Sequence, residues 1–517
     1  MSPRKSNMSI AAGNVEELIE YAKIKLSLDD ADVCFVRNAL LALLQISCPS
    51  EEKVGSYNFQ QSLDSLVGYA IKSGIIEEKS SLLFETQIMG ILTPMPSRVI
   101  EIFDNLASYQ GVKEASQWLY DLSVASNYIR KCDIDKNIKW DYEGTHGKIC
   151  ITINLAKPEK DPKDVAAAKL AATGYPKCLL CAENVGFYGN AGHPARQTIR
   201  TIPLTLNNED WFMQFSPYVY FDQHLIVINN EHRPMDLTFD SFVRMLDFVE
   251  LFPHYFIGSN APLPIVGGSI LAHDHYQGGA KILPMFSTRG RAFYNLSGFP
   301  DVNVSLPDWY NSVVRLSSKN KEQLLDAVMK LYDFWKDYTD ESLDILAYTL
   351  DNDGKKTQHN TITPICRIND DNEFCFDLIL RNNRTDESHP YGIFHPSEEL
   401  HNIKKEAIGI IEVMGLFILP GRLSKESMEI KDILTGKTTL DFKSLASDDN
   451  PLQKHLGAIA QLTSDHGTKL SDEDAENVIT DYINTSCEKI LKTTAVFKND
   501  EKGQAAFDNF MQSLSKS

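Results

Sequence analysis

The chain has 517 residues, 43% hydrophobic and 23% charged, which is ordinary for a soluble globular protein with a sizeable core. Its length is that of about three average domains, or of fewer large ones. Asp and Glu number 70 against 51 Lys and Arg, so the net charge is −19. Such an acidic field repels nucleic-acid backbones and anionic membrane surfaces, so we expect neither as a partner.

The sequence shows no pattern of a signal peptide, a membrane span or a disulfide framework. The N-terminus MSPRKSNMSI lacks the apolar core of a signal peptide. The most apolar stretch, residues 407–420, is shorter than a bilayer span and contains Glu412. The nine cysteines are odd in number and scattered, which favours free thiols over a disulfide framework. We therefore expect a cytoplasmic protein without a membrane span.

Hydrophobic periodicity predicts the elements in chain order. Helices are expected over residues 16–135, then a strand over 148–155, a strand over 224–229 and a helix over 237–256 with Asp236 or Thr238 as its cap. Further elements are a strand or strand end over 269–277, helix over 305–350, a strand over 372–383, a helix over 403–416 and helix from 470 onward. The pattern predicts an α+β protein in which residues 1–147 form a helical N-terminal region.

The segment GGSILAHDHYQGG, residues 267–279, carries two histidines separated by one aspartate. In a strand, His273 and His275 point to one face and Asp274 to the other. A neutral imidazole is a competent nucleophile near neutral pH, and its phosphoramidate adduct suits a two-step nucleotidyl transfer. Taken alone, the H-x-H pair is equally compatible with buried structural histidines.

Glycines flank the pair on both sides. Gly267 and Gly268 allow the backbone to approach a ligand closely, and successive N–H groups there could cradle a phosphate.

Cys178 and Cys181, in KCLLCAENV, form a Cys-x-x-Cys pair typical of a zinc knuckle. A redox pair or two buried free thiols are the alternatives, although the preceding AATGYP does not supply the setting of a redox motif. Two more ligands are needed, and the downstream candidates are His193, His224, His232 and His273. Zinc held by two cysteines and two histidines would be a closed, structural site. It would make His273 a ligand and leave His275 as the nucleophile.

Several strings together resemble a known family. The segments 178–185, 227–237 and 273–277 resemble the nucleotidyltransferase branch of the histidine-triad superfamily. More closely, the chain resembles the long bacterial (type 2) galactose-1-phosphate uridylyltransferases. Further matching segments are 126–130, 152–162, 359–365, 378–385, 392–396 and 401–423.

The resemblance implies an architecture and a reaction. Two histidine-triad-like halves with mixed or antiparallel sheets are expected, over residues 148–300 and 301–517. His275 would attack the α-phosphorus of UDP-glucose, releasing glucose-1-phosphate. Galactose-1-phosphate would then take the UMP from the uridylyl-histidine. A homodimer is a candidate assembly, and no organic cofactor is expected.

Gln277 distinguishes transfer from hydrolysis. The hydrolases of the superfamily have a third histidine at this position, which passes a proton to the leaving group. A glutamine lacks that proton but can hydrogen-bond a non-bridging phosphoryl oxygen. The middle residue of the shorter family branch is proline, whereas here it is Asp274.

The same resemblance assigns the remaining site residues. His232 matches the third zinc ligand and His273 the fourth, with His224 as the alternative third. Asn260 matches an asparagine that contacts phosphate, and Gly267, Gly268 and Ser269 occupy the place of the phosphate-binding loop.

Phosphates also need cations. The candidates for the diphosphate are Lys157, Lys160 and Arg196, and those for the sugar phosphate are Arg381, Arg384, Lys404 and Lys405. For each, a solvated surface charge is the alternative interpretation.

Two rival functions are also compatible with the sequence. A nucleotide-sugar or dinucleoside-polyphosphate phosphorylase would share His275 but use inorganic phosphate as the acceptor. A zinc-binding or nucleotide-binding scaffold without catalysis would not depend on His275.

Overall fold

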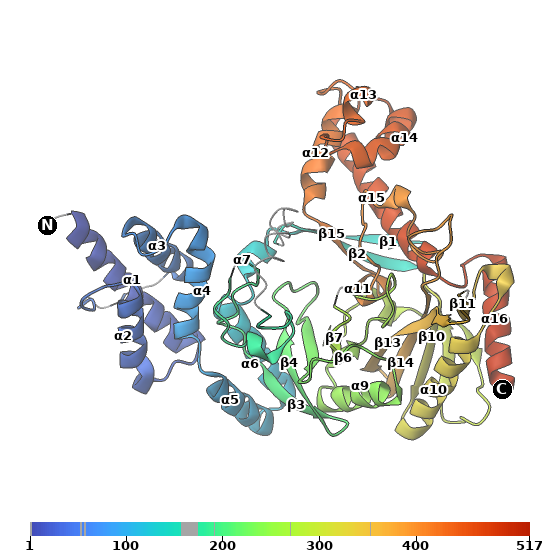
Figure 1. Cartoon of the computed structure of the whole chain (residues 1–517), viewed down its shortest axis with the longest axis horizontal. Helices are drawn as coiled ribbons and strands as arrows, with labels where there is room; N and C mark the ends of the chain where they lie inside the picture. Colours follow the sequence, from blue (N-terminus) through green and yellow to red (C-terminus); the bar gives the residue numbers. More distant parts are fainter. Residues whose placement is uncertain are drawn as a thin grey trace.

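A computed structural model describes most of the chain, and its class is α+β, as predicted. The described residues are 3–51, 54–55, 58–156, 174–190, 192–268, 270–351 and 353–517. Figure 1 shows an N-terminal group of helices at one end, a large sheet in the middle, and a smaller sheet with C-terminal helices beside it. No helix in these ranges is long and apolar enough to cross a membrane.

The N-terminal region is built of amphipathic helices. These are α1 (Pro3–Lys25), α2 (Val33–Leu43), α3 (Phe59–Lys72), α4 (Ser81–Leu92), α5 (Pro96–Tyr109), α6 (Val112–Ala125) and α7 (Lys131–Ile134). In α1 the buried Val15, Leu18 and Ala22 recur every three or four residues, as one helix face requires. The helices end at Ile134, as predicted by the helical pattern over 16–135, and strand β1 starts at Ile138, within the N-terminal region of residues 1–147.

A ten-stranded sheet forms the centre, in the order β3-β4-β5-β7-β6-β13-β14-β10-β9-β8. Its strands are β3 (Ile202–Leu206), β4 (Glu209–Phe215), β5 (Leu225–Asn229), β6 (Tyr255–Gly258), β7 (His275–Ala280), β8 (Gly290–Tyr294), β9 (Asn303–Pro307), β10 (Val313–Ser318), β13 (Asn360–Ile368) and β14 (Phe374–Asn382). Every pairing in it is antiparallel. Strands β3 to β7 form one half of the sheet and β8, β9, β10, β13 and β14 the other, and the two halves join where β6 pairs with β13.

The two faces of this sheet are covered differently. Helices α9 (Phe239–Leu251) and α10 (Lys321–Asp337) pack on one face through residues such as Phe242 and Leu331. The other face meets a second core that includes Ile365, Ile379 and Ile410. This second face carries the candidate site.

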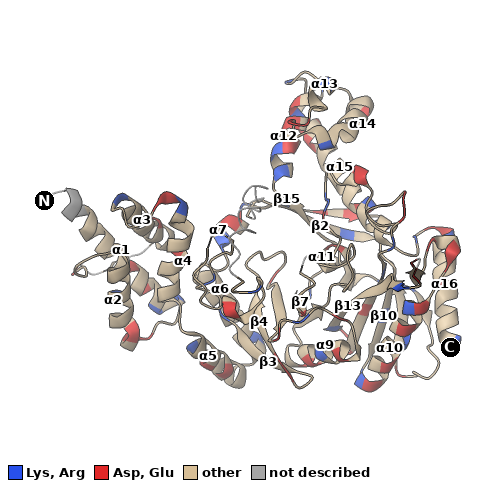
Figure 2. Ribbon diagram, in the orientation of Figure 1, with Lys and Arg blue, Asp and Glu red and all other residues tan. Residues whose placement is uncertain are grey.

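The smaller sheet has the order β1-β2-β15 and lies on the side of the site. Strands β1 (Ile138–Gly144) and β2 (Gly147–Asn154) form a hairpin, and β15 (Leu416–Pro420) pairs with β2 in parallel. The C-terminal helices follow as α12 (Arg422–Leu434), α13 (Phe442–Leu445), α14 (Leu456–His466), α15 (Asp472–Thr494) and α16 (Glu501–Lys516). Figure 2 shows charged residues of both signs along the outer helices, including α10 and α12.

Three predicted helices were wrong in extent. The helix predicted over 237–256 is capped by Thr238 but ends at Leu251, and the apolar residues after Pro253 form β6. The segment 305–350 contains β9, β10 and β11 (Tyr348–Leu350) besides α10, and β12 (Lys356–Gln358) pairs with β11.

The helix predicted over 403–416 shrinks to α11 (Ile410–Val413), between Gly409 and Gly415. Gly415 has a φ of 92°, which ends the helical turn. The apolar side chains here are buried on several sides, so periodicity cannot separate a helix from buried irregular chain.

Candidate active site and metal centre

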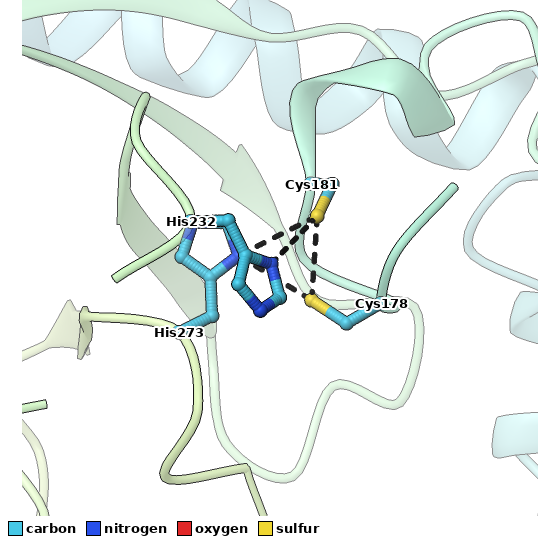
Figure 3. A group of neighbouring side chains, drawn as sticks. All are labelled: Cys178, Cys181, His232 and His273. Atoms are coloured by element: carbon cyan, nitrogen blue, oxygen red, sulfur yellow. Dashed lines mark hydrogen bonds between the residues drawn. The ribbon is translucent and has the colours of Figure 1, made fainter. Parts of the chain in front are cut away.

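Four predicted metal ligands come together beside the start of β7 (Figure 3). The ligand atoms of Cys178, Cys181, His232 and His273 all lie within 4.8 Å of one another. The two sulfurs are 3.5 Å apart, and the sulfur-to-Nδ1 distances are 3.3 Å (Cys178–His273), 3.1 Å (Cys181–His232) and 3.7 Å (Cys181–His273). Tetrahedral zinc requires about 3.8 Å between sulfurs and about 3.6 Å between sulfur and nitrogen. The donor set and its size therefore fit zinc.

A short turn presents the two cysteines. The Asn184 amide donates to the carbonyl oxygens of Cys178 (2.9 Å) and Cys181 (2.8 Å), which holds both ends of the turn. His193 bonds the Asn184 side-chain oxygen at 2.6 Å and so supports the turn, and it is not one of the four clustered residues. The sequence had not identified Asn184, because its role depends on contacts with main-chain atoms.

A hydrogen bond to the main chain orients the His273 ring. Its Nε2 donates to the Asn229 carbonyl oxygen at 2.8 Å, which leaves the Nδ1 lone pair facing the cysteine sulfurs. A second hydrogen bond of this kind is typical of metal-bound histidines, since it fixes the tautomer and the ring plane. His273 precedes β7, so of the segment 269–277, predicted as a strand or strand end, only residues 275–277 lie in the strand.

His275 is the first residue of β7 and is 6% exposed. Its Nδ1 lies 2.8 Å from the His273 carbonyl oxygen, which can only accept, so Nδ1 carries the proton and Nε2 the lone pair. Burial lowers the pKa of His275 from 6.5 to about 4. The imidazole is therefore neutral at physiological pH, with a nucleophilic nitrogen available.

Asp274 points away from the two histidines, as the sequence predicted. Its carboxylate lies 3.4 Å from Arg233 Nε, and Arg233 pairs with Glu209 at 2.7 Å. Tyr276 faces the same side and stacks on Trp211 with ring centroids 5.1 Å apart. This packing anchors β7 from the face opposite His275.

Gln277 lies on the His275 face, where it pairs with Ile226 on β5 and with Gly258 on β6. His224 Nε2 is 3.1 Å from Gln277 Oε1. His224 thus stands beside Gln277 and is not among the clustered ligands, so the structure favours His232 as the third ligand.

Asn260 and the glycine loop are the predicted phosphate-binding residues. Asn260 is 4% exposed, and its Oδ1 accepts from the Ile410 backbone N–H at 3.0 Å. A Cβ at Gly268 would lie 2.6 Å from Asn260 Nδ2, and one at Gly267 would lie 2.4 Å from the Ala261 carbonyl oxygen. Both glycines are therefore required by close packing of the loop itself. Ser269 lies outside the described residues.

The candidate cations differ in their surroundings. Lys404 is buried and pairs with Glu412 (3.0 Å) and Glu406 (3.4 Å). Arg384 contacts Asp344 at 3.4 Å. The structure thus pairs both cations with carboxylates of the same chain.

Arg381, Lys405 and Arg196 have no carboxylate partner in the described part of the chain. Arg381 is 1% exposed and donates one N–H to the Ile408 carbonyl oxygen, while its Nη1 has no described partner. Lys405 is exposed. Arg196 lies 5.9 Å over the Tyr128 ring. Lys157 and Lys160 lie outside the described residues.

Comparison with known proteins identifies the family. Residues 51–234 match the N-terminal domain of galactose-1-phosphate uridyl transferase, and residues 248–441 match its C-terminal domain. A galactose-1-phosphate uridylyltransferase of Caldanaerobacter subterraneus is 46% identical over 97% of this chain and 98% of its own length. The chain belongs to the galactose-1-phosphate uridylyltransferase family.

Other members of the family are similarly close. Galactose-1-phosphate uridylyltransferases of Fusobacterium nucleatum and Bacillus subtilis are 45% and 42% identical, each over 97% of this chain and over 98% and 97% of their own lengths. A solved yeast Ap4A phosphorylase covers 60% of this chain and 89% of its own, at 10% identity and a TM-score of 0.31. That likeness is too low to support a statement about this chain.

Several residues of this family member's site were not predicted from sequence. Tyr220 and Phe221 pack against His224, Asn229 orients His273, and Ile410 bonds Asn260. Asn229 and Ile410 act through main-chain atoms and are far in sequence from their partners. Tyr220 and Phe221 are within four residues of His224, but the loop conformation that brings their rings onto it has no sequence pattern. The glycine Gly258 leaves room for Ile410 above the sheet, since a Cβ there would lie 2.5 Å from Ile410 Cδ1.

Proposed function

We propose that this chain is a UDP-glucose–hexose-1-phosphate uridylyltransferase that works by a two-step transfer through His275. The main observation is the buried, neutral His275, whose proton is held on Nδ1 by the His273 carbonyl oxygen, two residues before Gln277. Family membership supports the substrates, because the relatives are named galactose-1-phosphate uridylyltransferases.

In the first step, His275 Nε2 attacks the α-phosphorus of UDP-glucose. A P–N bond forms, the bond from phosphorus to the bridging oxygen breaks, and glucose-1-phosphate leaves. The ring then carries a positive charge, which the Nδ1–H···O=C bond to His273 stabilises. No general base is needed, since Nε2 carries no proton.

In the second step, a phosphate oxygen of galactose-1-phosphate attacks the same phosphorus and displaces the imidazole, giving UDP-galactose. The attacking oxygen is already ionised, so this step also needs no proton transfer. Gln277 would bond a non-bridging oxygen through its amide N–H groups. Because Gln277 cannot act as an acid toward a leaving group, the intermediate persists until the sugar phosphate arrives.

Zinc would be held by Cys178, Cys181, His232 and His273 and would supply structural cross-linking when bound. The His275 ring donates its Nδ1–H to the main-chain carbonyl oxygen of His273, so the cluster also fixes the position of His275. We propose that Asn260 and the loop of Gly267, Gly268 and Ser269 bind the phosphate groups of the substrates.

We propose further binding residues and an assembly for this chain. Arg196, Lys157 and Lys160 are candidates for the diphosphate, and Arg381 for the sugar phosphate. We also propose transferase halves at 148–300 and 301–517, a cytoplasmic location and a homodimer.

Intact-protein mass spectrometry tests this function. Wild type incubated with UDP-glucose alone should gain one uridylyl group, and galactose-1-phosphate should remove it. His275→Ala should gain none, whereas His466→Ala, which alters an exposed histidine on α14, should behave as wild type. Discharge by inorganic phosphate and not by the sugar phosphate would indicate a phosphorylase. No adduct on metal-replete wild type would contradict the proposal.

A further inference from the structure

The Gln277 side chain has one hydrogen-bond partner in the described part of the chain, and that partner is His224. His224 stands immediately before β5, two residues from Ile226, which pairs with Gln277 on β7. Because side chains two positions apart share a face, His224 and Gln277 meet on the side of the sheet that carries His275. The contact joins Nε2 of the imidazole to Oε1 of the amide at 3.1 Å.

His224 is buried in an aromatic setting and is 2% exposed. Its ring lies 5.5 Å from the Tyr220 ring at an interplanar angle of 25°, and 4.5 Å from the Phe221 ring at 34°. Burial lowers the pKa of His224 to about 4. The ring is therefore neutral at physiological pH and has one N–H to donate.

The surroundings decide which nitrogen carries that proton. His224 Nδ1 is buried and has no hydrogen-bond partner among the described residues. A proton on Nδ1 would be an unpaired buried N–H, which proteins rarely retain, whereas a proton on Nε2 meets the amide oxygen of Gln277. The Nε2–H tautomer is therefore favoured.

This tautomer fixes the direction of the Gln277 amide. With Oε1 held toward His224, the NH2 group of Gln277 points the other way, and it has no partner in the described part of the chain. The opposite flip would place the carbonyl oxygen toward the phosphoryl group, where two acceptors repel each other. We propose that His224 is a positioning residue that directs the amide N–H groups of Gln277 at a non-bridging phosphoryl oxygen.

The proposal rests on the role of Gln277 in the proposed function, and it involves no covalent or proton-transfer step. Substitution of His224 should lower kcat for uridylylation with little change in KM, because the donor is used as charge develops. His224→Phe keeps the ring packing and removes the donor, and we expect a loss of about 10- to 100-fold. His224→Gln, whose amide can also donate, should recover part of that rate.

A stereochemical readout separates positioning from mere packing. The probes are the two UDP-glucose analogues in which one or the other non-bridging α-oxygen is sulfur. Wild type should favour one analogue, and Gln277→Ala should reduce that preference. His224→Phe should reduce the preference to the same extent, and the double variant should show no further reduction. Loss of packing alone would slow both analogues equally and leave the preference unchanged.

The possible failures are distinguishable. If wild type forms no uridylyl adduct, the proposed function itself fails. If wild type forms the adduct but treats both analogues alike, or if His224→Phe keeps the wild-type preference, the positioning role of His224 is overturned. Zinc content and thermal midpoint monitor folding of each variant. Nitrogen-15 NMR of the wild-type protein shows which ring nitrogen of His224 carries the proton, and it does not depend on a variant that folds. A proton on Nδ1 would also overturn the proposal.

Discussion

Replacing Cys181 by serine tests the metal centre and its link to the nucleophile. The Cys181 sulfur contacts both histidines of the cluster, at 3.1 Å and 3.7 Å, so it takes part in more of the short distances than His232 does. Serine offers a protonated hydroxyl in place of a thiolate, and three good ligands remain. If zinc affinity falls about 1,000-fold and free zinc is held at about 100 times the original Kd, the linked loss of stability is about 2.7 kcal/mol.

Metal analysis and thermal unfolding at a fixed free zinc concentration measure this effect. Wild type should hold one zinc per chain, and Cys181→Ser should hold much less and unfold at a lower temperature. Cys132→Ser is the matched control, because Cys132 is exposed and distant in sequence from the cluster. Equal zinc content and equal midpoints for Cys181→Ser and wild type would refute the reasoning. So would a wild-type protein that cannot be loaded with zinc.

Three other substitutions give clear expectations. Asp377 is fully buried between two arginines, so Asp377→Asn should cost about 3–5 kcal/mol in urea unfolding, and a cost below 1 kcal/mol would contradict this. Gly258→Ala should slow uridylylation and cost about 1–3 kcal/mol, because its Cβ would meet Ile410, whereas Gly457→Ala, in open space, should do neither. The pKa of His224 is lowered in the folded protein, so as the pH falls this histidine takes up its proton in the unfolded chain before it does so in the folded one. Stability should therefore fall by up to about 3 kcal/mol between pH 6.5 and 4, and His224→Phe should unfold with a shallower pH dependence over that range.

The sequence was most informative where the functional residues lie close together along the chain. Cys-x-x-Cys and H-x-H-x-Q are local patterns, and alternation alone placed Asp274 opposite the histidines. The helix cap was narrowed to Asp236 or Thr238 for the same reason, since capping involves residues three positions apart, and the structure selects Thr238.

Elements buried on all sides were the least predictable. Strand β13 has no exposed residue, and the segment around α11 is apolar without a solvent face, so amphipathic periodicity is absent in both. The equally buried β14 was predicted as a strand over 372–383 from its apolar run. The contact between His224 and Gln277 joins residues of different strands, and only the pairing of β5 with β7 reveals it. Family resemblance placed His232, instead of His193 or His224, among the ligands.

Strand β15 has a consequence for how the protein is made. It pairs with β2, and its neighbour Ile410 covers the sheet at Gly258, so the site is closed by residues that follow His275 by more than a hundred positions. At about 5–20 residues per second, the ribosome needs roughly seven to thirty seconds to pass from the nucleophile to that cover. During this interval one edge of β2 stays unpaired, and such edges attract other strands. Chains that stop before residue 410 should therefore aggregate during synthesis instead of accumulating as a stable N-terminal half.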